Sequence, residues 1–195
     1  MTNLEKRGAN VKVKDLVKMN FDPVMRPEDL KAAKTKEYTS EVKSEQADIL
    51  WADVLVTISP VWFGNVPGFL KAYFDKLFVM GFGYDEKGNG LLQGKRIFSL
   101  FTMGSGDTYL ELSNQYKGIE FLWDNLFGFV GFCDVALKYF RNIASSTDEE
   151  RQNYLKEASE FTDQIFNVEL GRIGKIGNGA LLAKLQSQGY LSGRI

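Results

Sequence analysis

Three short apolar runs, spaced along the chain, predict the strands of a parallel β-sheet. They are Ala52–Ser59, Lys95–Met103 and Asp134–Arg141. The first run has few polar residues, which is typical of a parallel strand that is covered on both faces. A fourth run, Asn10–Leu16, alternates apolar and charged residues and predicts an edge or half-exposed strand.

Longer stretches with helical spacing of apolar residues lie between and after these runs. The clearest, Asp148–Phe166, begins at a capping box formed by Ser146 with Glu149 or by Thr147 with Glu150. Other helices are predicted at Glu28–Val42, Val42–Trp51, Val66–Val79 and Leu110–Phe129, and Thr2–Arg7 predicts a last helical turn that ends at Gly8. This alternation indicates an α/β domain with a doubly wound parallel sheet over residues 1–170, followed by a C-terminal tail over residues 171–195.

Composition narrows the possible chemistry. The 195 residues include 24 basic and 25 acidic side chains, so charge gives no reason to expect nucleic acid or an anionic membrane as partner. No apolar run approaches the roughly 20 residues of a membrane-spanning helix, and we expect no membrane insertion. The chain has no histidine, which excludes histidine-activated nucleophiles and imidazole-ligated zinc, and we expect no metal. The single cysteine, Cys133, agrees with a cytoplasmic location and is expected to be a buried, inert thiol.

Two loops that follow neighbouring predicted strands carry residues suited to ligand binding. In Pro60–Pro67, Trp62 and Phe63 follow the strand, and Gly64 and Asn65 tolerate backbone angles that turn amides toward a ligand. The second loop, TMGSGDTY, offers two hydroxyls and two glycines that allow close approach: Thr102, Ser105, Gly104 and Gly106. Because such loops meet at one edge of a parallel sheet, they predict a site for a flat heteroaromatic molecule. The alternative is a pair of ordinary strand-to-helix turns whose aromatic residues pack locally.

Several stretches, in their order and spacing, resemble the NAD(P)H:quinone oxidoreductases, a DT-diaphorase-like family of flavoproteins with a flavodoxin-like fold. The stretches are VKDLVKMNFDPV, ADVLVTISPVWFGNVPGFLKAYFDKLF, FTMGSGDTY, the Trp123 region and GFVGFCDV, and the resemblance covers Asn10–Phe166. It implies a homodimeric enzyme in which a flavin takes a hydride from NADH or NADPH and then reduces a quinone by ping-pong kinetics. FAD is favoured as cofactor through Gly104–Cys133, and FMN is the alternative because the GNVPG turn resembles FMN-binding relatives.

The resemblance also implies roles for individual residues. Tyr109 matches a tyrosine that helps to settle charge on the reduced flavin, and Gln115 stands where the family has a histidine. Glutamine cannot take up a proton near neutral pH, so we expect an altered rate or pH profile. The residues implied to bind flavin are Pro60, Val61, Trp62, Phe63, Gly64, Asn65, Thr102, Met103, Gly104, Ser105, Gly106 and Tyr109. Those implied to bind the quinone, some from the second subunit, are Trp62, Phe82, Tyr84, Thr108 and Phe132.

The amino terminus departs from the family pattern. Family members begin with a hydrophobic strand and a phosphate-binding loop, whereas Met1 matches a position near the end of the family's first helix. We therefore expect the chain to lack the first strand, which would lie between Asn10–Leu16 and Ala52–Ser59, together with the phosphate anchor. Either the sequence is truncated, which we favour, or the tail after Leu170 fills the gap. Flavin binding is then expected to be weak or absent.

Three other functions fit parts of the pattern. An FMN-dependent azo- or nitroreductase would use a similar site and differ in its electron acceptor. A regulatory subunit of a potassium-efflux system would show weak turnover and bind a membrane transporter. A non-functional fragment would fold poorly and bind no flavin.

Overall fold

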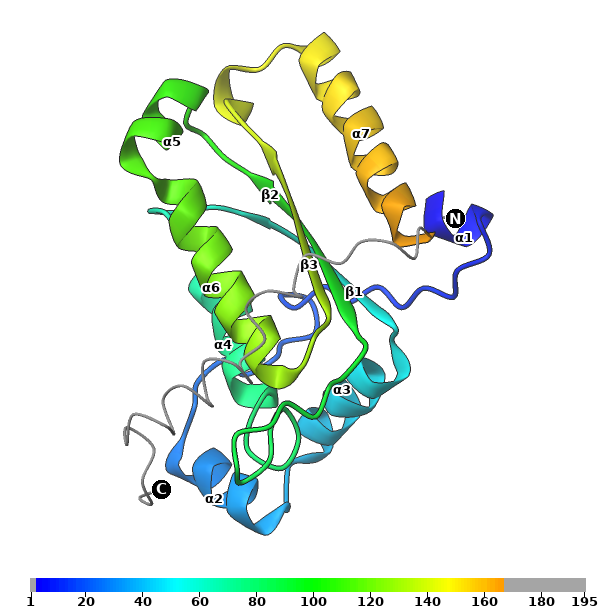
Figure 1. Ribbon diagram of the computed structural model, residues 1–195, viewed down its shortest axis with the longest axis vertical. Coiled ribbons are helices and arrows are strands. Elements are labelled where there is room, and N and C mark those ends of the chain that lie inside the picture. Colours follow the sequence, from blue (N-terminus) through cyan, green and yellow to red (C-terminus); the bar gives the residue numbers. More distant parts are fainter. Residues whose placement is uncertain (1–2, 167–195) are drawn as a thin grey trace.

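A computed structural model describes residues 3–166 and has a three-stranded parallel sheet at its centre (Figure 1). The strands β1 (Val54–Pro60), β2 (Arg96–Thr102) and β3 (Asp134–Phe140) lie side by side in that order. The strands are in register from the first residue of each to the last. The three apolar runs therefore form parallel strands, as the sequence predicted.

Helices cover both faces of this sheet (Figure 1). The helices α4 (Gly68–Leu77) and α6 (Gln115–Val130) pack on one face, and α7 (Asp148–Asp163) packs on the other. The remaining helices are α1 (Asn3–Lys6), α2 (Pro27–Thr35), α3 (Ser40–Trp51) and α5 (Asp107–Ser113), with 3₁₀ turns at Ile143–Ser145 and Gln164–Phe166. This arrangement is the predicted doubly wound α/β fold. Within residues 3–166, no helix has the length and apolar character needed to cross a bilayer.

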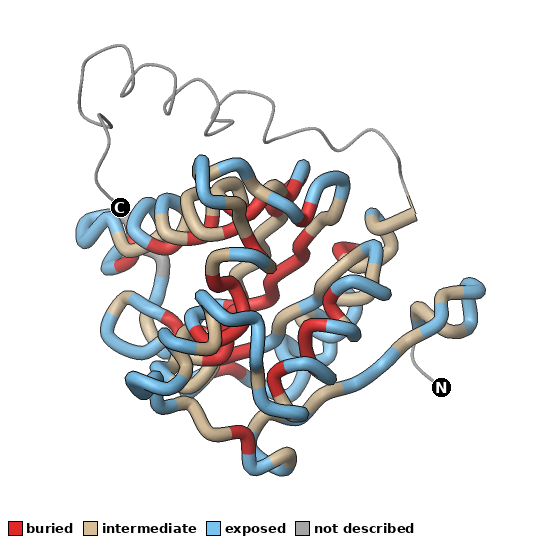
Figure 2. Tube along the Cα trace, turned by 90° about the horizontal axis from the view of Figure 1, so that it is seen from below, coloured by how far each residue is buried: buried red, intermediate tan, exposed pale blue. Residues whose placement is uncertain are grey.

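Aromatic side chains form much of the larger core, between the sheet and the helices α4 and α6. Phe74, Trp123 and Phe127 contact one another edge to face, with ring centroids 5.1 to 6.4 Å apart. The indole Nε1 of Trp123 also donates a 2.7 Å hydrogen bond to the hydroxyl of Ser99 on β2. Figure 2 shows buried residues gathered along the strands and the inward sides of the helices. Close packing of this kind makes the sheet and α6 a rigid base for the loops at the sheet edge.

The predicted signals at two helix ends are confirmed. Of the two possible capping boxes, α7 uses the second, in which the Thr147 hydroxyl accepts from the amide of Glu150 and the Glu150 carboxylate accepts from the amide of Thr147. The helix α1 is followed by Gly8, whose φ of 92° suits glycine. Both ends follow local rules that the sequence displays directly.

The prediction of a strand at Asn10–Leu16 is wrong. The segment pairs with no strand among residues 3–166. Its lysines bind α3 instead, and the Nζ of Lys14 lies 2.7 Å from a carboxylate oxygen of Glu45. The other oxygen of Glu45 accepts a 2.8 Å hydrogen bond from the hydroxyl of Tyr73 on α4. The alternation of lysine and valine therefore reflects ion pairing with a helix and not strand pairing.

The strand β1 is less covered than the sequence predicted. It pairs with β2 along one edge, and no described segment pairs with its other edge. Val56 and Ile58 are 37% and 75% exposed, whereas their register partners Phe98 and Leu100 lie buried in the core under α7. An apolar run predicts a strand, but its burial depends on neighbours that the run does not specify. The tail after Leu170, the proposed filler of this gap, lies outside the described residues.

Two predicted helices have different bounds. The single helix expected over Leu110–Phe129 is two helices, because Asn114 between α5 and α6 has a left-handed backbone with φ 53°. Likewise, Lys36 with φ 61° ends α2, so the stretch Glu28–Val42 is not one helix. Cys133 is exposed and not buried as predicted. It follows Phe132, which takes the inward position before β3 begins.

Candidate functional site

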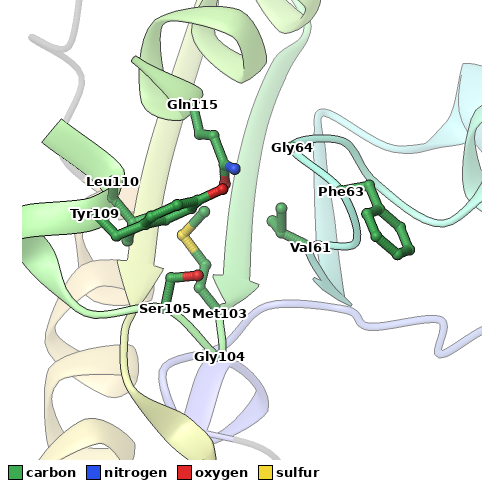
Figure 3. Close-up of a pocket in the computed structure, with 9 residues that line it drawn as sticks. All are labelled: Val61, Phe63, Gly64, Met103, Gly104, Ser105, Tyr109, Leu110 and Gln115. Carbon is green, nitrogen blue, oxygen red and sulfur yellow. The ribbon is translucent and has the colours of Figure 1, made fainter. Parts of the chain in front are cut away.

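A cavity opens at the carboxyl edge of the sheet, between the loops that follow β1 and β2 (Figure 3). Its volume is about 200 Å³, and the described residues that line it are all uncharged: Val61, Phe63, Gly64, Met103, Gly104, Ser105, Tyr109, Leu110 and Gln115. Ligands of open parallel sheets bind beyond this edge, because the loops there diverge and leave room. Among residues 3–166, no group of three or more potential metal ligands occurs.

The loop after β1 turns sharply at Phe63 and Gly64. The amide of Trp62 donates to the carbonyl of Asn65 at 2.8 Å, and the amide of Asn65 donates back at 3.1 Å. The two residues inside this turn have positive φ angles, 50° for Phe63 and 77° for Gly64. Turns of this type favour Asn-Gly, because a larger side chain in the left-handed region costs about 1–2 kcal/mol. Phe63 is fully exposed, so packing within this chain does not offset that cost.

Strain of this kind concentrates at binding sites, where a ligand or partner uses the strained residue. Figure 3 shows the ring of Phe63 turned away from the cavity, while its backbone and Gly64 form the rim. The neighbouring Trp62 is 65% exposed. The first loop therefore presents two aromatic rings to solvent beside the cavity.

The loop after β2 is fixed to the loop after β3 by backbone hydrogen bonds. The amide of Ile143 donates to the carbonyl of Met103 at 3.0 Å, and the amide of Asn142 donates to that of Ser105 at 3.1 Å. Among the described residues, the amides of Gly104 and Ser105 have no hydrogen-bond partner. These two amides are therefore donors available to a ligand, and the hydrogen bonds of Met103 and Ser105 to the loop after β3 hold them in place.

The fold does not itself require a glycine at position 104. A β-carbon built on Gly104 would meet no atom within 4 Å, and the φ of Gly104 lies outside the left-handed region. A glycine at such a place suits a ligand that approaches the backbone closely. By contrast, Gly64 has a positive φ of 77°, and a β-carbon on it would lie 3.6 Å from the side chain of Gln115.

Tyr109 on α5 and Gln115 at the start of α6 form the wall opposite Val61 (Figure 3). The figure shows the ring of Tyr109 lying along the cavity with its hydroxyl end toward Gln115, and the thioether of Met103 below that ring. Tyr109 is 57% exposed, so the cavity is open to solvent on this side. The left-handed backbone of Asn114 joins the two helices and so lets both contribute to one wall.

The structure brings together about half of the residues implied by the family resemblance. Eight of them line the cavity, and Leu110 is the lining residue that the sequence did not single out. Leu110 is fully buried beside Tyr109, and the sequence placed it only at the start of a predicted helix. The other implied residues of these loops and of α5 do not line the cavity: Pro60, Trp62, Asn65, Thr102, Gly106 and Thr108.

Three implied quinone-binding residues lie at the opposite edge of the sheet. Phe132 is 2% exposed and packs against Phe78 and Phe127 with ring centroids 6.2 and 5.1 Å away. Phe82 and Tyr84 belong to the loop that joins α4 to the amino end of β2. Seven-residue strands separate the two edges by roughly 20 Å. Within one chain, these three residues therefore do not reach the cavity.

Comparisons with known proteins agree with this architecture. A family model described as flavodoxin-like fold matches residues 1–162. An uncharacterized NAD(P)H oxidoreductase of Haemophilus influenzae is 31% identical over 162 residues, which cover 81% of this chain and 80% of that protein. The ribosyldihydronicotinamide dehydrogenase (quinone) of Mus musculus is 29% identical, with 85% and 82% covered. The solved structure of an NAD(P)H:quinone oxidoreductase from Methanothermobacter marburgensis matches with a TM-score of 0.73 at 25% identity, over 84% of each chain.

Proposed function

Because this chain belongs to the NAD(P)H:quinone oxidoreductase family of flavodoxin-like proteins, we propose that it is a flavin-dependent enzyme that reduces a quinone or a related small aromatic acceptor. The observation that carries the proposal is the uncharged cavity between the loops after β1 and β2. A bound flavin would supply the redox chemistry, accepting a hydride from NADH or NADPH in one half-reaction and reducing the quinone in the next. Two similar proteins carry quinone in their names, which supports this acceptor class.

The residues of the cavity fit an isoalloxazine ring. That ring carries carbonyl and nitrogen acceptors, and the amides of Gly104 and Ser105 are donors without a partner in the described part of the chain. Val61 and Met103 offer apolar contact, and the open space at Gly104 lets a flat edge approach the backbone. In this proposal the remaining residues of the two loops extend the contact: Pro60, Trp62, Asn65, Thr102 and Gly106.

Tyr109 and Gln115 are proposed to stabilise charge on the ring. The hydroxyl of Tyr109 and the side-chain amide of Gln115 both donate hydrogen bonds, and both lie on the same wall (Figure 3). Glutamine has no titrating proton, so Gln115 adds no ionisation step near neutral pH. Replacing Gln115 by histidine would add a group that titrates near pH 6.5. We expect the Gln115→His variant to gain a pH-dependent step in turnover between about pH 5.5 and 7.5 that the parent protein lacks.

The quinone site is proposed to be completed in a homodimer. Trp62 and Phe63 expose apolar surface beside the cavity, as a substrate- or subunit-contacting region does. Phe82 and Tyr84 are too far from the cavity of their own chain, so in this proposal they reach the cavity of a second subunit. Thr108 belongs to the same proposed set, whereas Phe132 is buried against Phe78 and Phe127 and is not proposed to contact the quinone. We also propose a cytoplasmic location and FAD as the cofactor, with FMN as the alternative.

Steady-state kinetics test the enzyme proposal directly. The protein is loaded with FAD or FMN, and oxidation of NADH or NADPH is followed with a naphthoquinone or an azo dye as acceptor. We expect quinone-dependent oxidation with parallel double-reciprocal lines, the signature of ping-pong kinetics. A folded protein that oxidises neither nicotinamide faster than free flavin would contradict the proposal. Faster turnover with the azo dye than with the quinone would favour an azoreductase instead.

A further inference from the structure

The chemistry of the cavity indicates which part of a flavin it contacts. We propose that this site recognises the isoalloxazine ring alone, so that lumiflavin, riboflavin, FMN and FAD bind with similar affinities. The inference rests on the proposed function and deepens it, because it assigns ring recognition to the described residues and leaves the phosphates in solvent.

The first support is the character of the lining. All nine lining residues are uncharged, and their polar groups are backbone amides, hydroxyls and one side-chain amide. Such groups suit the neutral edge of a heteroaromatic ring. Phosphate groups are usually held by arginine or lysine or by amides at a helix N-terminus. The cavity therefore contributes little that distinguishes a phosphorylated flavin from riboflavin.

The second support is the open rim. Phe63 is fully exposed, Tyr109 is 57% exposed, and Gly104 and Gly106 are exposed as well. A ribityl chain that leaves the ring across this rim enters solvent, where its phosphate stays hydrated. Ion pairs between exposed groups are weak and change a dissociation constant by no more than about fivefold.

The third support is the pairing of charges on β3 and α7. Lys138 Nζ lies 2.7 Å from a carboxylate oxygen of Glu157. The pKa of Glu157 is lowered first by this hydrogen bond and also by the positive charge of Arg141. Arg151 pairs with Asp148 on the same helix at 3.2 Å. Lys138 and Arg151 already pair with carboxylates, so recruiting either one to a phosphate would exchange one exposed ion pair for another with little net gain.

Equilibrium titration of the purified protein with the four flavins tests the inference, with quenching of flavin fluorescence as the readout. We expect dissociation constants within about fivefold of one another, and little change between roughly 50 and 500 mM NaCl. Gly104→Val should weaken binding of all four flavins by about tenfold or more, because its side chain occupies the open space at the cavity. Gly118→Val is the matched control, since Gly118 also has no neighbour within 4 Å but lies in α6 and is not among the residues that line the cavity.

The outcomes separate this inference from the enzyme proposal. FMN or FAD binding more than about thirtyfold tighter than riboflavin, with a strong salt dependence, would overturn ring-only recognition and leave the flavoenzyme proposal intact. The N-terminus of α4, which follows the first loop, would then be the place to look for the phosphate. A folded protein that binds none of the four flavins would overturn both.

Discussion

Replacing Phe63 by asparagine should make the protein more stable and less active. Phe63 holds a left-handed backbone with φ 50° inside a tight turn, next to Gly64. For a bulky residue this conformation costs about 1–2 kcal/mol, whereas asparagine tolerates it and Asn-Gly is the favoured pair in such turns. The ring is fully exposed, so its removal loses no buried apolar area. We therefore expect Phe63→Asn to raise the free energy of unfolding by about 1 kcal/mol.

Urea denaturation measures this change as a higher midpoint at an unchanged slope. A gain of about 1 kcal/mol corresponds to a rise of roughly 2–4 °C in the melting temperature for a chain of this size. Phe121→Asn is the matched control, because Phe121 is also exposed, at 71%, but lies in the regular helix α6. There asparagine should be neutral or slightly destabilising, since it is no better a helix former than phenylalanine.

The same variant separates stability from function. If Phe63 contacts a quinone, Phe63→Asn should lose quinone turnover while gaining stability, which is the trade-off expected of a strained binding residue. A lower unfolding midpoint for Phe63→Asn would refute the reasoning, because it would mean that the ring is packed or that the turn does not strain it. Greater stability with unchanged turnover would show that the strain has no role in the proposed reaction.

Four further substitutions test the fold. Ile97→Ala should lower the free energy of unfolding by about 2–5 kcal/mol, because Ile97 is fully buried. Ile58→Ala in the neighbouring strand should change it by less than about 0.5 kcal/mol, because Ile58 is 75% exposed. Gly90→Ala should cost about 1–3 kcal/mol in urea denaturation, because its β-carbon would lie 2.4 Å from backbone atoms at the end of α6. Hydrogen bonds from Lys12 and Lys14 lower the pKa of Asp48 in the folded protein. The carboxylate of Asp48 therefore adds to the free energy of unfolding above its unfolded pKa near 4, and this stabilisation is lost as pH falls through its lower pKa in the folded protein. Asp48→Asn should therefore lower the urea midpoint near pH 6. Between about pH 5 and 3 the midpoint of the variant should fall less steeply with decreasing pH than that of the parent protein, and an equally steep fall would contradict this.

The three strands of the sheet could be predicted from the sequence because each is a short apolar run bounded by turn residues. The candidate ligand site was less directly predictable from the sequence. The glycines at 104 and 106 indicated a loop that a ligand can approach, and the structure places that loop beside Val61 and Gly64 at one cavity. The left-handed backbone of Phe63 was not predictable, because sequence signals for this turn type are Asn-Gly or Asp-Gly and not Phe-Gly.

The wrong predictions of elements and burial have physical causes that the local sequence pattern does not contain. Lysines that alternate with valines look the same in an edge strand and in a segment held by ion pairs, as Lys14 and Glu45 show. The break at Asn114 lies between two helical stretches, and one asparagine is too weak a signal to end a helix in a sequence. The exposure of Ile58 depends on which segments lie next to β1, and composition carries no such information.

The central claim is that a flavin ring binds between the loops after β1 and β2, and a difference-absorbance titration tests it most directly. Flavin is held at fixed concentration while protein is added, and its absorption band near about 450 nm is followed. The account predicts a saturable change in that band with one flavin per chain, which Gly104→Val abolishes or weakens while the variant keeps the parent's unfolding midpoint. A folded parent protein that leaves the band unchanged for both FAD and FMN would contradict it.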